Sequence, residues 1–132
     1  TVVILSDGEL GEGSNWEAFL SASHHKLDNL VAIVDYNKLQ SLTTVEDTLN
    51  LEPLIDKFKA FGWEVLEVDG HDHNMLVETF KKVPFEIDKP SVILAHTVKG
   101  KGVSFMENSV QWHYKSPSDQ ELALAIKEIK NA

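Results

Sequence analysis

The sequence predicts an α/β fold in which a parallel sheet lies between two layers of helices, a three-layer doubly wound architecture. Two observations predict it. Short apolar runs bounded by polar and turn-forming residues read as strands, at residues 2–5, 30–34, 63–68 and 91–97. Segments with the length and apolar spacing of helices separate these runs, as in consecutive βαβ units. In such a sheet the carboxyl ends of the strands share one edge, where ligands bind.

Capping and apolar spacing define the expected helices. Ser14 followed by Glu17 predicts a capping box for the first helix, with apolar positions on one face at Trp16, Phe19, Leu20, Ser23 and Leu27. A second helix is expected from Pro53 to Phe61, because proline suits a first turn and Gly62 follows. A third is expected over 73–83, with inward side chains at Leu76, Val77 and Phe80.

A second capping box, Ser118 with Glu121, predicts the last helix, with one apolar face formed by Leu122, Ala125, Ile126 and Ile129. The segments between these elements are expected to be irregular. They are a polar loop at 40–50, a flexible basic loop at 99–102 and the stretch 105–114.

Composition narrows the function classes. The chain has 132 residues, is 42% hydrophobic and carries a net charge of −9, which suits one domain with an ordinary core. All 12 basic residues are lysines without a dense cluster, so a nucleic acid partner is not expected. No apolar run approaches the roughly 20 residues that cross a membrane. The absence of cysteine excludes disulfides and thiolate sites and fits a cytoplasmic location.

The amino terminus suggests an incomplete chain. Thr1 leads directly into an apolar strand, without an initiator methionine. Because a parallel sheet needs flanking strands, we expect upstream residues to be missing, so that the chain is a fragment or a processed subunit.

Polar residues at the strand ends predict a cation site. Asp7-Gly8 follows the first strand and Asn37 follows the second. Both strands would open on one edge, bringing together a carboxylate and an amide, which are oxygen ligands for Mg²⁺ or Ca²⁺, usually together with phosphate oxygens. The alternative is that Asp7 and Asn37 only form turns, which both residue types favour.

Several blocks in order along the chain resemble transketolases and their thiamine diphosphate motif. The blocks are Ser6-Asp7-Gly8-Glu9-Leu10-Gly11-Glu12-Gly13, Trp16-Glu17-Ala18 and Asp35-Tyr36-Asn37-Lys38-Leu39-Gln40. Thr97-Val98-Lys99-Gly100-Lys101-Gly102-Val103-Ser104-Phe105-Met106-Glu107 and Trp112-His113 resemble the amino-terminal subunit of split bacterial transketolases. The resemblance covers nearly the whole chain and implies the thiamine diphosphate-binding fold, here incomplete at the amino terminus.

The resemblance also implies residue roles. Asp7, the Asn37 side chain and the Leu39 carbonyl would ligate Mg²⁺ or Ca²⁺, and Gly8 would donate its N–H to the diphosphate. His113 would lie near the diphosphate and the reacting carbons and handle protons. Glu12, with Glu17, would lie at a dimer interface between two active sites. The motif's first glycine is Ser6 here, which could add a hydrogen bond or crowd the loop, but we expect metal binding to survive.

The implied reaction is transfer of a two-carbon ketol unit between sugar substrates, usually phosphorylated, with the cofactor supplying the difficult chemistry. The family's active site also needs a pyrimidine-binding domain, which no block of this chain resembles. We therefore expect a partner domain or subunit in a homo- or hetero-oligomer. The chain alone is expected to bind thiamine diphosphate weakly and to turn nothing over.

Other functions remain open. The chain could belong to another thiamine diphosphate enzyme, namely a deoxyxylulose phosphate synthase, a 2-oxo acid dehydrogenase component or a decarboxylase. It could also be a subunit with a non-catalytic, assembly role. A nucleotide-binding Rossmann domain is disfavoured because no Gly-x-Gly-x-x-Gly follows the first strand.

The remaining candidate residues have structural interpretations. His24-His25 is expected at the surface, His71-Asp72-His73 in a turn and cap, and His96 packed in a strand. Lys99 and Lys101 could face phosphate, but a solvated loop is the favoured interpretation. The aromatic side chains of Trp16, Phe61 and Trp63 are expected in the core.

Overall fold

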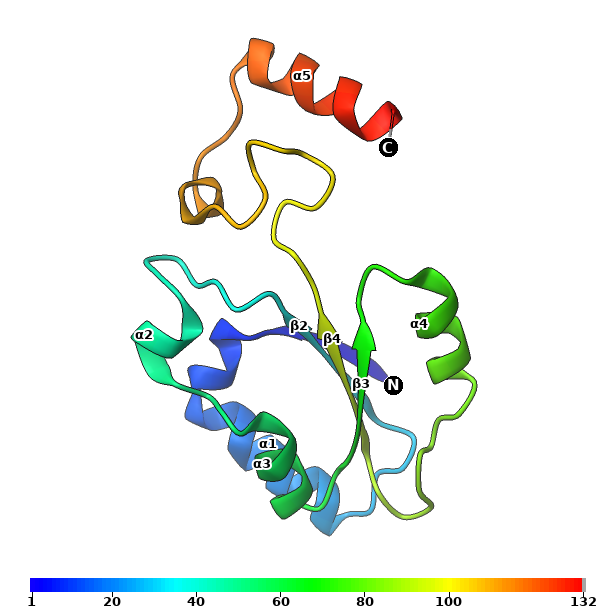
Figure 1. Cartoon of the computed structure of the whole chain (residues 1–132). Helices are drawn as coiled ribbons and strands as arrows, with labels where there is room; N and C mark the ends of the chain where they lie inside the picture. Colours follow the sequence, from blue (N-terminus) through cyan, green and yellow to red (C-terminus); the bar gives the residue numbers. More distant parts are fainter. Residues whose placement is uncertain (132) are drawn as a thin grey trace.

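The protein contains a four-stranded, all-parallel sheet with helices on both faces, as a computed structural model that describes residues 1–131 shows (Figure 1). The strands are β1 (Val2–Ser6), β2 (Val31–Tyr36), β3 (Glu64–Asp69) and β4 (Ser91–His96). They lie in the order β1-β2-β4-β3, so β4 is inserted between β2 and β3. The predicted doubly wound α/β class is confirmed.

The helices follow the predicted order, with one addition. The structure contains α1 (Gly13–His24), α3 (Leu54–Ala60), α4 (His73–Phe80) and α5 (Asp119–Lys130). Two short 3₁₀ helices are η1 (Gly8–Gly11) and η2 (Val110–His113). The prediction of a loop throughout 40–50 was wrong, because α2 (Val45–Leu49) forms there. Thr44 begins that helix by accepting a hydrogen bond from the Asp47 N–H at 3.1 Å.

The two predicted capping boxes have opposite outcomes. The Ser118–Glu121 box is present at the start of α5. The Ser14–Glu17 box was wrong: α1 begins at Gly13 with Glu12 as its N-cap residue, which makes no side-chain cap. The 3₁₀ turn of η1 leads into α1 through a hydrogen bond from the Glu12 N–H to the Glu9 carbonyl at 3.0 Å. Ser14 is therefore already inside the helix and cannot cap it.

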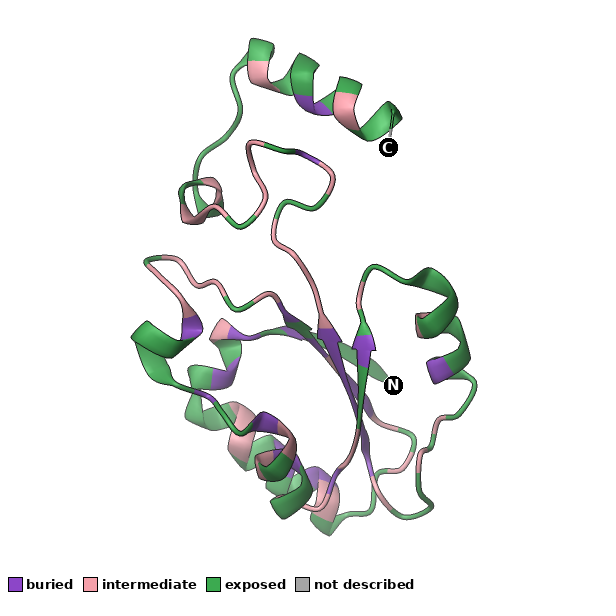
Figure 2. Ribbon diagram, viewed as in Figure 1, coloured by how far each residue is buried: buried purple, intermediate pink, exposed green. Residues whose placement is uncertain are grey.

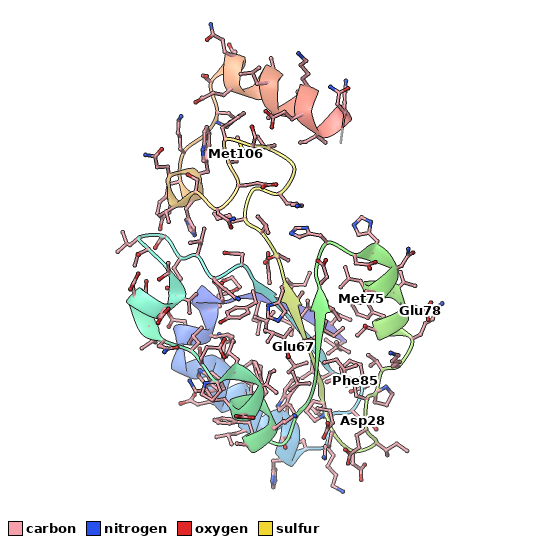
Figure 3. The ribbon with its side chains drawn as sticks, in the orientation of Figure 1. Asp28, Glu67, Met75, Glu78, Phe85 and Met106 are labelled. Carbon is pink, nitrogen blue, oxygen red and sulfur yellow. The ribbon has the colours of Figure 1, made fainter. Side chains whose placement is uncertain are left out.

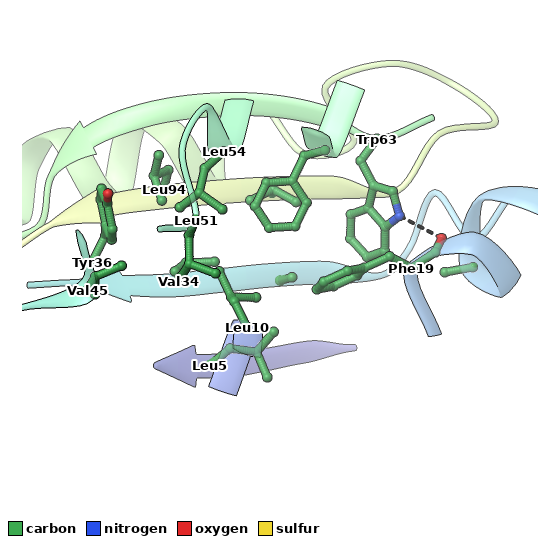
Figure 4. Packing of buried hydrophobic residues seen from close by; sticks show 14 residues of the cluster. Leu5, Leu10, Phe19, Val34, Tyr36, Val45, Leu51, Leu54, Trp63 and Leu94 are labelled. Carbon is green, nitrogen blue, oxygen red and sulfur yellow. Dashed lines mark hydrogen bonds between the residues drawn. The ribbon is translucent and has the colours of Figure 1, made fainter. Parts of the chain in front are cut away.

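One sheet face carries the main hydrophobic core, together with α1, α2 and α3 (Figures 1 and 4). Trp63 is 2% exposed, and its indole N–H donates to the Phe19 carbonyl of α1 at 2.9 Å. Phe58 packs edge-to-face on Phe19, with ring centroids 5.1 Å apart. Trp16 and Phe61 are half-buried and pack against this cluster. The expected core role of these aromatic residues is thus confirmed.

The opposite face is covered by α4 and by the segment that follows it, and has a smaller core. Its buried members are Val31, Val68, Ile93 and Ala95. Figure 3 shows Met75 of α4 beside β3, and its sulfur accepts a hydrogen bond from the Asp69 N–H at 3.3 Å. The predicted inward positions of Val77 and Phe80 were wrong, because these side chains are 53% and 37% exposed.

Strand β1 forms an edge of the sheet and is less buried than predicted. Only Leu5 of its apolar residues is buried, whereas Val2 is 54% and Ile4 is 69% exposed. Val2 and Ile4 pair with Val31 and Ile33 of β2, on the face that α4 covers elsewhere. The expectation of a buried strand holds for one face only, because α4 lies over the other end of the sheet.

Helix α5 lies away from the sheet, after the long segment that follows β4 (Figures 1 and 2). The Glu128 carboxylate accepts hydrogen bonds from the N–H and hydroxyl of Ser104, at 2.6 and 2.9 Å. Of the apolar face predicted for α5, only Ala125 is buried; the others are exposed, namely Leu122, Ile126 and Ile129. Among residues 1–131, no helix has the length and apolar character needed to span a bilayer.

Candidate functional site

The carboxyl edge of the sheet brings distant polar residues together, as the strand order requires. Ser6 pairs with Asp35 in the β1–β2 register, and Tyr36 pairs with His96 in the β2–β4 register. Asp7 and Asn37 therefore leave adjacent strands at the same edge. The Thr97 hydroxyl, just beyond β4, donates a hydrogen bond to the Asp35 carboxylate.

Asp7 is a buried carboxylate held by the loop after β2. It is 2% exposed, and its Oδ2 accepts a hydrogen bond from the Lys38 N–H at 2.7 Å. Burial raises the pKa of Asp7, while the N–H groups of Lys38 and Gly8 act in the opposite direction. A negative charge in this position is thus solvated by backbone dipoles and remains costly to bury, as expected for a cation ligand.

The loop 37–39 presents further oxygen atoms. The Asn37 Oδ1 accepts a hydrogen bond from the Leu39 N–H at 3.0 Å, which forms a tight Asx turn. Between them, Lys38 adopts a left-handed backbone conformation with φ of 66°, and its carbonyl accepts the Val45 N–H at 3.0 Å. The Leu39 carbonyl accepts no hydrogen bond from any group in residues 1–131. The loop that carries these two oxygen atoms is also the loop that bonds to Asp7, through the Lys38 N–H.

A polar contact anchors this loop to α3. The Tyr36 hydroxyl donates to the Glu52 carboxylate at 2.5 Å, and the other Glu52 oxygen accepts the Leu54 N–H at 2.9 Å. The hydrogen bond from Tyr36 is the main cause of the lowered pKa of Glu52. Because Tyr36 immediately precedes Asn37, this contact fixes the loop 37–39 to the start of α3.

A hollow of about 450 Å³ lies at this edge. It is lined by every residue predicted from the sequence as a cofactor, metal or catalytic candidate. Those lining residues are Asp7, Gly8, Glu12, Asn37, Leu39 and His113. Gly8 lines it: apart from the neighbouring residues, a Cβ at this position would lie in ordinary contact with the side chains of Gln40 at 3.8 Å and Ser6 at 3.9 Å. Packing against the rest of the described chain therefore does not require glycine here.

A larger hollow of about 650 Å³ adjoins the first and shares Asn37 and Leu39 with it. It is lined mainly by the loop 36–39, by α2 and by Glu52. Of the two hollows, only the smaller one is lined by Asp7, Gly8 and His113.

The structure adds residues that the sequence interpretation did not favour. Lys99 is half-buried and lines the hollow, whereas Lys101 is exposed and lies 3.9 Å from the Glu107 carboxylate. The loop that carries them is not simply solvated, because the Asn108 N–H bonds to the Lys99 carbonyl at 3.0 Å. The sequence contained a signal for this position of Lys99, because Lys99 lies two residues beyond Thr97, close to the carboxyl end of β4. Asp35, Ser6, Glu9 and Tyr114 also line the hollow.

The other histidines lie outside the hollow. His24 and His25 are exposed on α1, as expected. The turn-and-cap prediction for 71–73 is confirmed, because the Asp72 carboxylate caps α4 by accepting the Met75 N–H at 3.0 Å. His71 Nε2 accepts the Val98 N–H at 2.8 Å. Glu17, expected beside Glu12, does not line the hollow.

The donor set fits a hard divalent cation together with a phosphorylated ligand. Residues 1–131 hold no cluster of three His, Cys, Asp or Glu side chains that could bind a metal. A cation here would therefore need the Asp7 carboxylate, the Asn37 amide oxygen and the Leu39 carbonyl, with further oxygens from a ligand or water. Mg²⁺ binds in this manner in many sites, with few protein ligands and substrate phosphates.

Known proteins match this chain over nearly its whole length. The family "Transketolase, thiamine diphosphate binding domain" matches residues 1–130. The chain is 47% identical over 129 residues to one subunit of the apulose-4-phosphate transketolase of Actinobacillus succinogenes, and 43% identical to the same subunit from Phocaeicola vulgatus. These alignments cover 98% of this chain and 46% of each relative. The chain thus spans about half the length of these curated relatives.

Solved structures agree with the sequence matches. The transketolase of Campylobacter jejuni superposes with a TM-score of 0.89 at 30% identity, covering 98% of this chain and 20% of that protein. The transketolase of Leishmania mexicana gives a TM-score of 0.79 at 24% identity, covering 99% of this chain and 23% of that protein, which shows the shared fold. Asp7, the loop 37–39 and the parallel sheet all lie within the matched residues. The chain thus belongs to the transketolase family and corresponds to its thiamine diphosphate-binding domain.

Proposed function

We propose that this chain is the diphosphate- and metal-binding domain of a split transketolase, which transfers a two-carbon ketol unit between sugar phosphates. The observation that carries the proposal is the buried Asp7 carboxylate beside the Asn37 amide and the free Leu39 carbonyl. The names of the curated relatives support it, since they are subunits of transketolases named for apulose 4-phosphate and 6-deoxy-6-sulfo-D-fructose. Thiamine diphosphate, when bound, supplies the carbon centre that carries the two-carbon unit.

The chain's own residues bind and orient in this proposal. Asp7, Asn37 and Leu39 hold Mg²⁺, with Ca²⁺ as a substitute, through three oxygen atoms. Gly8 donates its backbone N–H to the diphosphate, which approaches closely because no Cβ stands in the way. Lys99, which lines the same hollow, adds a positive charge near the phosphate oxygens.

His113 and Glu12 have roles toward the substrate and the partner. His113 ends the 3₁₀ helix η2, is exposed and lines the hollow, so its ring can hold or move a proton at a substrate oxygen. Glu12 is exposed at the start of α1 and lines the same hollow, where it would meet the partner chain. Neither role requires movement of the sheet.

The active enzyme is an oligomer in this proposal. A pyrimidine-binding domain or a second chain completes the site, and the relatives support this because each is named as one subunit of a larger transketolase. The 132 residues act as one domain and turn nothing over alone. We also propose a cytoplasmic location for the enzyme, because the chain has no cysteine and so needs no oxidising compartment.

The metal and diphosphate site can be tested by calorimetry on the full-length protein that carries this sequence, purified with its partner chain. Titration with thiamine diphosphate should give saturable binding in Mg²⁺ and little binding in EDTA. Asp7→Asn keeps the size of the side chain and an acceptor for the Lys38 N–H but removes the charge. We expect it to weaken Mg²⁺-dependent binding by about a hundredfold or more, since even outer-shell changes reach about a hundredfold.

Asp56→Asn is the matched control, because Asp56 is an exposed carboxylate on α3 outside both hollows. Its affinity for thiamine diphosphate should equal that of the unmodified protein. Equal binding by the Asp7 variant, or binding that ignores Mg²⁺, would contradict the metal assignment. Consumption of a 2-oxo acid with release of CO₂, instead of ketol transfer between sugar phosphates, would contradict the transketolase assignment.

A further inference from the structure

The Asp7-Gly8 peptide is enclosed by a pair of side chains, Ser6 and Glu9, which bond to each other across it. The Glu9 Oε2 accepts the Ser6 N–H at 2.8 Å and the Ser6 hydroxyl at 3.2 Å. In return, the Ser6 Oγ accepts the Glu9 N–H at 3.3 Å. We call this reciprocal arrangement the Ser6–Glu9 box. Ser6 stands where the transketolase motif has its first glycine, so its side chain adds a hydroxyl to that motif.

The Ser6–Glu9 box is equivalent to the capping box that begins α5. There, Glu121 accepts the N–H and the hydroxyl of Ser118, both at 2.8 Å, and its own N–H bonds to the Ser118 Oγ at 3.4 Å. Such boxes satisfy the free N–H groups at the start of a helical turn and fix the entry of the chain. In the Ser6–Glu9 box, the two residues between the partners are the proposed metal ligand and the proposed diphosphate donor.

The Ser6–Glu9 box also fixes the position of a charge at the hollow. Ser6 and Glu9 both line it, together with Asp7. A carboxylate that accepts two hydrogen bonds from Ser6 is held in one place. Glycine at position 6 could offer only the N–H. The hydroxyl supplies the second donor and the acceptor for the Glu9 N–H.

We propose that Ser6 and Glu9 are positioning residues, which hold the Asp7-Gly8 peptide in its ligand-binding conformation through their reciprocal hydrogen bonds. The inference rests on the proposed function of this site. Neither residue needs to touch the reacting atoms. Their effect is on the affinity for cofactor, and it depends on both members of the pair.

The test uses calorimetric titration of the full-length protein and its partner with thiamine diphosphate at saturating Mg²⁺. Ser6→Ala and Glu9→Ala should each weaken binding by about three- to tenfold, the range expected for the loss of one or two hydrogen bonds. The double variant should be no weaker than the worse single variant, because the two side chains act as a unit. Ser6→Thr, which keeps the hydroxyl, should restore most of the affinity.

Two further measurements separate positioning from general destabilisation. Ser118→Ala breaks the equivalent box at α5, outside the hollow, and should leave the affinity unchanged. In the cofactor-free protein, Ser6→Ala should increase amide hydrogen exchange at Glu9 and Leu10, with no change for amides of β2. Unchanged affinity in both single variants, or effects of the two that multiply fully in the double variant, would overturn the inference.

The same experiment distinguishes this inference from the proposed function. If the unmodified protein does not bind thiamine diphosphate with Mg²⁺, the proposed function fails. If the unmodified protein binds it and the Ser6 and Glu9 variants bind equally well, only the Ser6–Glu9 box fails.

Discussion

The two faces of the sheet differ in how they are built. On the face with α1, α2 and α3, a single cluster of 14 buried residues includes Phe58 and Leu54, both fully buried. On the α4 face, the buried apolar cluster has four members, and Leu76 is the residue of α4 that packs against it, only partly buried. The three-helix face therefore holds most of the core.

The candidate site depends on the three-helix face. Tyr36, the last residue of β2, is buried in its cluster and bonds to Glu52 at the start of α3. Val45, whose N–H donates a hydrogen bond to the Lys38 carbonyl, is buried in the same cluster. The loop 37–39 is thus attached to the three-helix face, which holds the larger buried cluster. We expect substitutions on the α4 face to affect ligand binding less than substitutions on the three-helix face.

The largest effect is expected for Leu54→Ala. Leu54 is fully buried between α3 and the sheet, so its truncation leaves a cavity in a close-packed core. We expect a loss of about 3–5 kcal/mol in the free energy of unfolding. Urea denaturation followed by tryptophan fluorescence would measure it, since Trp16 and Trp63 lie in the same cluster. A loss below about 1 kcal/mol would show that this core relaxes around the cavity.

Leu76→Ala makes the same chemical change on the opposite face. Leu76 is half-buried between α4 and the sheet, so less apolar surface returns to water. The expected loss is about 1–2 kcal/mol, and thiamine diphosphate affinity should be unchanged. The same denaturation experiment and a calorimetric titration would measure the two quantities. A cost equal to that of Leu54→Ala would abolish the distinction between the faces.

The smallest effect is expected at α5, which belongs to neither face. Lys115 and the N–H and hydroxyl of Ser118 lower the pKa of Glu121 from 4.5 to about 2. Because the folded pKa lies below the unfolded value, the stabilisation of α5 is present above about pH 4.5 and disappears as the pH falls toward 2. Carboxyl resonances in an NMR titration would report the pKa of Glu121.

Glu121→Gln should remove this acid dependence from the protection of α5 amides while the sheet amides keep theirs. A Glu121 titration midpoint near 4.5 would show that the box does not persist in solution.

The strands and their polar ends could be predicted because both follow from local patterns. Each apolar run ends in a residue that cannot be buried without a partner, and parallel pairing then places these ends at one edge. Asp7 and Asn37 meet for this reason. Their roles, and that of His113, came from the resemblance to transketolases, because nothing in the spacing of His113 points to the hollow.

Other features depend on tertiary structure that local patterns do not contain. Among residues 1–131 the pattern Ser-x-x-Glu occurs at Ser6, Ser14, Ser104 and Ser118, yet only Ser6 and Ser118 form boxes, and Ser104 bonds to Glu128 instead. The Ser14 pattern fails because the preceding 3₁₀ turn starts α1 earlier. The position of Lys99 at the hollow could not be predicted, because it depends on how the segment after β4 folds back. The exposed residues of α5 show that spacing identifies a shared face but not what packs against it.

The left-handed conformation of Lys38 has a consequence for the thermodynamics of ligand binding. This conformation costs a residue with a side chain about 1–2 kcal/mol, and the hydrogen bonds to Asp7 and from Val45 hold it in place. The ordering of residues 37–39 is therefore completed during folding and not during binding. A cation would meet oxygen atoms already in position, so its association would carry little conformational entropy cost from the protein, and desolvation of the ion would dominate.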